Sequence, residues 1–170
     1  MTPIPLSRTP KNTRILVTLF LLTILAAFGV AGLNIYDKVA RYPKGVMARY
    51  GPDTGSAVDL NSLPPESEVM IARMNSFSQL VDVTHAHAFE LPLVMFVLAH
   101  FLMRSRVPEW FKLANYVGSS VGTVLFLAAP WLVRYVSAGM AGLFYVGAAG
   151  LITSAVLMIA VPIWDMWREA

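Results

Sequence analysis

The chain has 170 residues, of which 56% are hydrophobic and 14% charged; its formal net charge is +3 and it contains no cysteine. Soluble domains usually carry about 25% charged residues, so this composition excludes an ordinary soluble globule and predicts a single membrane domain over residues 1–170. The missing cysteine excludes thiolate metal sites, iron–sulfur clusters and haem attached through Cys-x-x-Cys-His, and the small, scattered positive charge argues against nucleic-acid binding.

The first predicted membrane span covers residues 15–33, a run of nineteen residues without a charge. As a helix this run reaches about 28 Å, close to the roughly 30 Å of a bilayer's hydrocarbon core. Arg8, Lys11 and Arg14 precede it, as basic residues precede a signal peptide's apolar core. The run is longer than a typical signal-peptide core, and Ala26, Ala27 and Ala31 make a poor cleavage site, so we interpret it as an uncleaved anchor.

Residues 34–79 form the long loop that we expect outside the bilayer. Its first part mixes apolar, basic and tyrosine residues, which is typical of a short interfacial helix, broken here at Pro43. Ser62 before Leu-Pro-Pro-Glu has the pattern of a helix start. We expect that helix to run into the second span without a break, so the loop is predicted to be partly helical.

The second predicted span, residues 83–103, is apolar except for a few titratable side chains, and Pro92 is expected to kink it. At 100° per residue, one arc of about 200° contains every titratable residue of this helix: Asp82, His85, His87, Glu90 and His100. The opposite arc contains Thr84, Ala88, Leu91, Met95, Leu98 and Ala99. Because ionisable groups are costly in lipid, we expect the titratable arc to face the bundle and the opposite arc to face lipid.

The third and fourth predicted spans, residues 113–133 and 138–164, are long uncharged runs. Both carry small residues at helical spacing, which allow membrane helices to approach closely: Gly118, Gly122, Gly142, Gly147, Gly150 and Ser154. The sequence therefore predicts an all-α integral membrane protein, a four-helix transmembrane bundle with one partly helical periplasmic loop.

The distribution of basic residues predicts the orientation of this bundle. The turn between the second and third spans carries Arg104, Arg106 and Lys112, against only Arg134 in the next short turn. The positive-inside rule then places both termini in the cytoplasm, in a bacterial inner membrane. Four basic residues that follow the first span oppose this orientation: Lys38, Arg41, Lys44 and Arg49. Basic residues in long loops carry less weight, so we keep the orientation given by the short turns.

The candidate site lies on the second span, where Asp82, His85, His87 and Glu90 are the predicted cofactor-binding residues and His85 and His87 the predicted metal ligands. Asp82–His85 and His87–Glu90 are spaced as neighbours on a helix, and a carboxylate can fix the tautomer of a ligand-binding imidazole. In a purely structural interpretation, Asp82 and His85 are hydrated at the membrane–water interface and have no functional role. Glu90 is then protonated or paired with Arg134. His100 is interpreted as an interfacial cap, and no residue is assigned a catalytic role.

Three kinds of ligand suit this chemistry. A haem b needs axial ligands on both sides, and since the other spans contain no histidine, the second would be a methionine such as Met140 or come from another chain. A quinone site needs only an imidazole that bonds to a quinone carbonyl and a carboxylate that exchanges its proton. Copper combines histidine with methionine, but Met70 and Met74 are too far along the helix to share a coordination sphere with His85.

The leading functional hypothesis is an inner-membrane component of an electron-transfer or quinone-linked system, with a site on the periplasmic side. We expect such a protein to act as a subunit or binding protein rather than as a stand-alone enzyme. Its expected partners are the lipid bilayer and other membrane or periplasmic subunits. The alternative is a non-catalytic accessory or scaffold subunit that docks a partner through its periplasmic loop. Ion transport along the line from Asp82 to His100 ranks last, because the other spans lack matching polar groups.

Overall fold

The structure is a computed structural model, and it describes residues 6–39, 43–51 and 77–168 of the chain. Within these ranges it contains only helices, four long and three short. The long ones are α1 (Lys11–Val39), α4 (Phe77–Met103), α5 (Glu109–Tyr135) and α6 (Ala141–Trp167). The short ones are η1 (Leu6–Arg8), α2 (Pro43–Tyr50) and η3 (Ala138–Met140).

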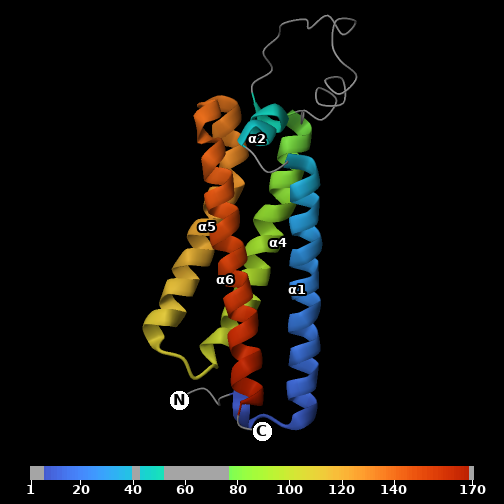
Figure 1. Cartoon of the computed structure of the whole chain (residues 1–170), viewed down its shortest axis with the longest axis vertical. Coiled ribbons are helices and arrows are strands. Elements are labelled where there is room, and N and C mark those ends of the chain that lie inside the picture. The colour runs from blue at the N-terminus through green and yellow to red at the C-terminus, as the bar shows by residue number, and fades with distance from the viewer. Residues whose placement is uncertain (1–5, 40–42, 52–76, 169–170) are drawn as a thin grey trace, which may run out of the picture.

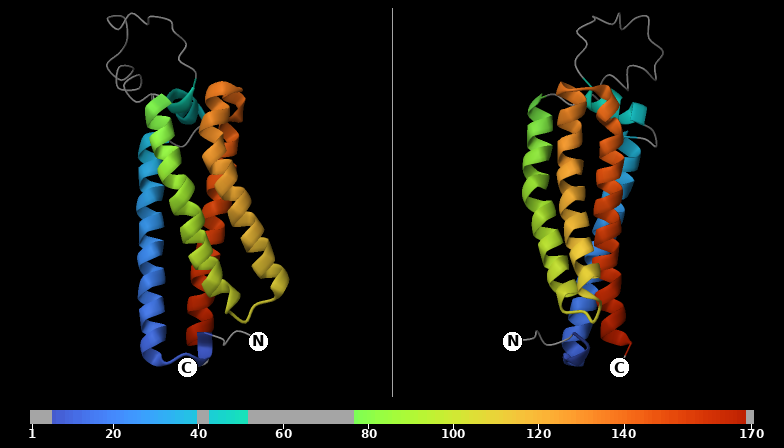
Figure 2. Two further views of the ribbon diagram at one scale, coloured as in Figure 1. Left: turned by 180° about the vertical axis from the view of Figure 1, so that it is seen from behind. Right: turned by 90° about the vertical axis from the view of Figure 1, so that its left-hand side faces the viewer.

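The four long helices stand side by side and form the expected four-helix bundle (Figure 1). All four are long and apolar enough to cross a membrane. At one end of the bundle, the terminal end, lie both chain termini and the α4–α5 turn; at the other, the α2 end, lie α2 and η3 (Figure 1). In the left view of Figure 2, α1 and α5 occupy opposite flanks, with α4 and α6 between them.

The helices contain the four predicted spans and extend beyond them, with α4 starting at Phe77 and continuing through Pro92. The long loop is partly helical as expected, because α2 lies within it. That helix begins at Pro43, where the sequence suggested a break; proline suits the first position of a helix, since its missing N–H would be unpaired there anyway. The helix expected from Ser62 lies outside the described residues.

The closest packing in the bundle joins α5 to α6 through glycines. A Cβ atom added at Gly147 would lie 2.5 Å from the backbone nitrogen of Phe126, and one added at Gly122 would lie 2.7 Å from that of Leu151. The predicted small-residue contact is confirmed at these positions. Gly142 does not take part, because a Cβ there would meet nothing within 4 Å.

Polar contacts fix the terminal end of the bundle. Lys112 is buried, and its Nζ donates to the carbonyl of Met103 at 3.1 Å and to Oε1 of Glu109 at 2.8 Å, so it ties the end of α4 to the start of α5. The buried carboxylate of Asp165 on α6 accepts a 3.3 Å hydrogen bond from the backbone N–H of Arg106. These contacts hold the α4–α5 turn against α6.

Candidate functional site

The orientation of α4 differs from the sequence-based expectation. Its buried residues are Leu80, Met95, Leu98 and Leu102, and Met95 and Leu98 belong to the arc that was expected to face lipid. The titratable residues of the opposite arc are exposed, with the exception of His87: Asp82, His85, Glu90 and His100. The expected inward orientation of these four is therefore wrong, because the large apolar side chains of α4 pack against the core that α1 and α6 also form.

The two candidate metal ligands are not brought together. His85 and His87 are two residues apart, which places them about 200° apart around a helix. The ring of His85 packs edge-on against Phe89 on the outer surface, with 5.2 Å between ring centroids, whereas His87 faces inward. Within the described ranges, no group of three or more His, Asp or Glu residues is placed to hold a metal ion.

The expected carboxylate partners of the histidines are also separate from them. Among the described side chains, neither Asp82 with His85 nor His87 with Glu90 forms an ion pair or hydrogen bond, and Glu90 does not pair with Arg134. The guanidinium of Arg134 lies instead over the ring of Tyr135, 5.9 Å from its centroid. The candidate site is therefore reduced to His87 and its surroundings.

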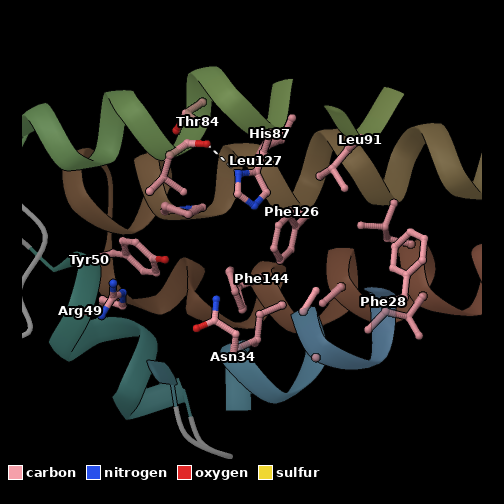
Figure 3. A pocket seen from close by; sticks show the side chains of 18 of the residues that line it. Phe28, Asn34, Arg49, Tyr50, Thr84, His87, Leu91, Phe126, Leu127 and Phe144 are labelled. Carbon is pink, nitrogen blue, oxygen red and sulfur yellow. Dashed lines mark hydrogen bonds between the residues drawn. The ribbon is translucent and has the colours of Figure 1, made fainter. Parts of the chain in front are cut away.

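His87 faces a cavity of about 300 Å³ towards the α2 end of the bundle (Figure 3). Helices α1, α2, α4, α5 and α6 all contribute to its walls, most of which are apolar or aromatic. The polar side chains that line it are Asn34, Arg49, Tyr50, Thr84 and His87. A volume of this size is at the lower end of the range for small-molecule sites, and a mostly apolar lining with a few polar groups is typical of them.

The imidazole of His87 is fixed by its own helix. Its Nδ1 lies 2.9 Å from the carbonyl oxygen of Val83, one turn earlier. A carbonyl oxygen can only accept, so Nδ1 carries the hydrogen and donates it. In the neutral ring Nε2 then has a free lone pair, and the ring projects from α4 into the cavity (Figure 3). The cavity thus contains a positioned hydrogen-bond acceptor.

The other polar groups of the cavity come from three different helices. Thr84 accepts a 2.9 Å hydrogen bond at Oγ1 from Trp131 Nε1, which joins α4 to α5. Arg49 and Tyr50 come from α2, with the guanidinium 5.9 Å from the centroid of the Tyr50 ring. Asn34 belongs to α1, and in Figure 3 its amide lies on the same side of the cavity as Arg49, across from His87. Arg49 and Asn34 supply N–H donors, so the cavity has donors and an acceptor on different walls.

Pro130 leaves one backbone carbonyl of α5 without its usual hydrogen-bond partner at the cavity. Pro130 lies inside α5, is buried, and lines the cavity together with Phe126. Because proline has no N–H, the carbonyl of Phe126 lacks its usual partner four residues later. Apart from His87, the polar residues of this cavity were not predicted from the sequence, since they are dispersed over separate helices and follow no periodic pattern.

A family model described as a transmembrane helical domain, Aq_1264_TM, matches residues 41–170. The chain belongs to this family. The Aq_1264_TM match includes α2, α4, α5 and α6, and with them Arg49, Tyr50, Thr84 and His87, whereas α1 precedes it. No curated protein and no solved structure matches the chain. With its four apolar helices, the chain is a multi-pass membrane protein whose environment is a lipid bilayer.

Proposed function

We infer that this protein is a quinone-linked membrane component that binds a quinol in the cavity beside His87. The observation that carries the proposal is the orientation of His87: its Nδ1 is occupied by the Val83 carbonyl, and Nε2 is available as an acceptor inside an apolar, membrane-embedded cavity. A quinol is a flat apolar ring with a hydroxyl donor at each end. Its ring suits the walls, and one of its hydroxyls suits Nε2.

The walls favour a planar ring. Phe28, Phe126 and Phe144 line the cavity, and the rings of Phe126 and Phe144 pack 4.9 Å apart. Aromatic pairs in such offset or tilted geometry add to the free energy of apolar burial. The donors of Arg49 and Asn34 lie on a different wall from His87 (Figure 3), where they suit the oxygen at the other end of the ring.

The hydrogen bonding of His87 also favours the reduced ligand, the quinol, over the oxidised quinone. A quinone has two carbonyl oxygens, which only accept hydrogen bonds, and a neutral His87 with Nδ1–H held by Val83 presents only an acceptor at Nε2. A quinol hydroxyl can donate to this nitrogen. We therefore expect the quinol to bind more tightly than the corresponding quinone.

The donor set of the cavity suits this ligand better than the two metal cofactors considered from the sequence. The cavity is lined by one histidine, and no methionine is among its lining residues in the described ranges. A haem b requires two axial ligands, and a protein copper site usually combines several histidine or sulfur ligands. Met140, the expected second haem ligand, lies in η3 and does not line the cavity.

The proposed location is a bacterial inner membrane, with the terminal end in the cytoplasm. Seven basic residues belong to described elements or turns at that end: Arg8, Lys11, Arg14, Arg104, Arg106, Lys112 and Arg168. The described elements at the α2 end contain four: Lys38, Lys44, Arg49 and Arg134. The positive-inside rule favours this orientation, which places the cavity in the periplasmic half of the bundle. As a binding subunit, the protein would pass its ligand to another component of the system.

The proposal can be tested with Trp131 as a fluorescent reporter, since its indole is bonded to Thr84 at the cavity wall. The other three tryptophans are replaced by phenylalanine, the protein is placed in lipid nanodiscs, and a short-chain benzoquinol is titrated without oxygen. We expect saturable binding that His87→Ala weakens about three- to tenfold, the usual worth of one hydrogen bond.

His85→Ala is the matched control, because it removes an imidazole from the outer face of the same helix turn and leaves the cavity intact. It should bind benzoquinol like the parent protein. Absence of saturable binding, or equal weakening by the two alanine substitutions, would show that His87 does not hold a quinol.

A further inference from the structure

Glu90 occupies an unusual place for a carboxylate in a membrane helix. It is thirteen residues after Phe77 and thirteen before Met103, the two ends of α4, so it lies about 20 Å from each. A hydrocarbon core of about 30 Å centred on this helix therefore contains Glu90 near its middle. The side chain is exposed, and none of the described residues bonds to it.

The surface around Glu90 is otherwise apolar. Phe89, Leu93 and Phe96 are 69%, 64% and 71% exposed, while Ala86 lies one turn before Glu90 on the same face. An exposed small residue beside a polar one lets a second helix approach closely enough to bond to it. We call this surface, made of Ala86, Phe89, Glu90, Leu93 and Phe96, the Glu90 face.

An ionised carboxylate at mid-depth is costly when it faces lipid, and such groups usually pair with another side chain. The charges on the outer side of α4 are acidic, since Asp82 and Glu90 are exposed and the helix contains no lysine or arginine. The complementary group is therefore a cation at the same depth, reached from outside this bundle.

A second copy of the chain does not supply that cation. The four predicted spans, residues 15–33, 83–103, 113–133 and 138–164, contain no lysine or arginine at all. A parallel copy docked through the same face would set Glu90 against Glu90, and like charges repel at short range. The complementary partner is a different protein.

We propose that the Glu90 face docks a transmembrane helix of another membrane protein, and that this helix carries a lysine or arginine at mid-depth which pairs with Glu90. The ion pair fixes the depth of the partner helix, and Ala86 allows the close approach. The proposal is independent of quinol binding, because this face and the cavity lie on opposite sides of α4.

The test uses the full-length protein in liposomes with a synthetic 23-residue leucine–alanine helix that has one central lysine. The chain contains no cysteine, so Val136→Cys, at an exposed position of the α5–η3 turn, accepts a single donor dye. Energy transfer to a labelled helix then reports association. We expect the lysine helix to associate about tenfold more strongly than the same helix with a central leucine, and Glu90→Gln to abolish the difference.

Two further variants sharpen the result. Asp82→Asn, on the same side of α4 but about 12 Å away along the helix, should keep the preference for central lysine. Glu90→Lys should lose it and prefer a helix with a central glutamate. Equal association of the lysine and leucine helices would overturn the proposal. Energy transfer between two labelled copies of the chain would also overturn it if Glu90→Gln removed that transfer, because the Glu90 face would then join identical subunits.

Discussion

Replacing Gly147 by alanine tests whether the close contact of α5 and α6 organises the bundle. The added Cβ would lie 2.5 Å from the nitrogen of Phe126 and 2.9 Å from its Cα atom. Ordinary Cβ contacts begin at about 3.4 Å, so the two backbones must separate by roughly 1 Å. These are backbone atoms of a packed helix, and no rotamer change can relieve the contact.

The magnitude follows from two opposing terms. Overpacking a tight contact costs about 1–3 kcal/mol, while alanine is a better helix former than glycine by up to about 1 kcal/mol. Gly150→Ala carries mainly the second term, since Gly150 also lies in the interior of α6 and its added Cβ would make only an ordinary contact, 3.6 Å from the Cα of Gly122. The difference between the two variants therefore isolates the packing cost, about 1–3 kcal/mol.

The assay is unfolding in mixed micelles titrated with denaturing detergent and followed by near-ultraviolet circular dichroism. Gly142→Ala is a second control, because its Cβ, near the start of α6, would meet nothing within 4 Å. We expect Gly147→Ala to unfold earliest, with Gly142→Ala and Gly150→Ala close to the parent protein. If Gly147→Ala unfolds together with Gly142→Ala, the α5–α6 contact is not as tight as described and the reasoning fails.

Two further substitutions test the cavity and the terminal end. Gly32 lines the cavity, and a Cβ there meets nothing within 4 Å. The leucine side chain of Gly32→Leu should therefore occupy part of the cavity and weaken benzoquinol binding on the order of tenfold or more in the Trp131 assay. Gly29→Leu, equally open but not lining the cavity, should bind normally; equal loss in both would contradict the assignment. Lys112→Met leaves the Met103 carbonyl without its side-chain donor, and detergent unfolding should show a loss of about 1–3 kcal/mol, whereas the exposed Lys11→Met should unfold like the parent protein.

The four membrane helices could be predicted because their signal is one of composition and length. Each predicted span is a long apolar run, and lipid excludes irregular backbone, so a helix is the only structure available to it. The glycines of α5 and α6 could also be predicted as contact residues, since close approach requires small side chains. Which glycines would meet, and that Gly142 would meet nothing, depends on the rotation of α6 about its axis, which the spacing of small residues alone does not determine.

The orientation of α4 could not be predicted by the rule that ionisable groups avoid lipid. That rule assumes that the partners of these groups are within the same chain, but the other spans contain no cation for Glu90 to meet. The opposite arc carries the large apolar side chains, and two of them, Met95 and Leu98, are buried in the main core. Packing of these side chains therefore decides how α4 is rotated. His87 is the exception because it lies at the margin between the two arcs, close enough to the buried side to reach the cavity. The residues that a single-chain rule misplaces are thus informative: an ionisable side chain at mid-depth that its own bundle leaves outside, such as Glu90, is where a contact with a second protein should be tested first.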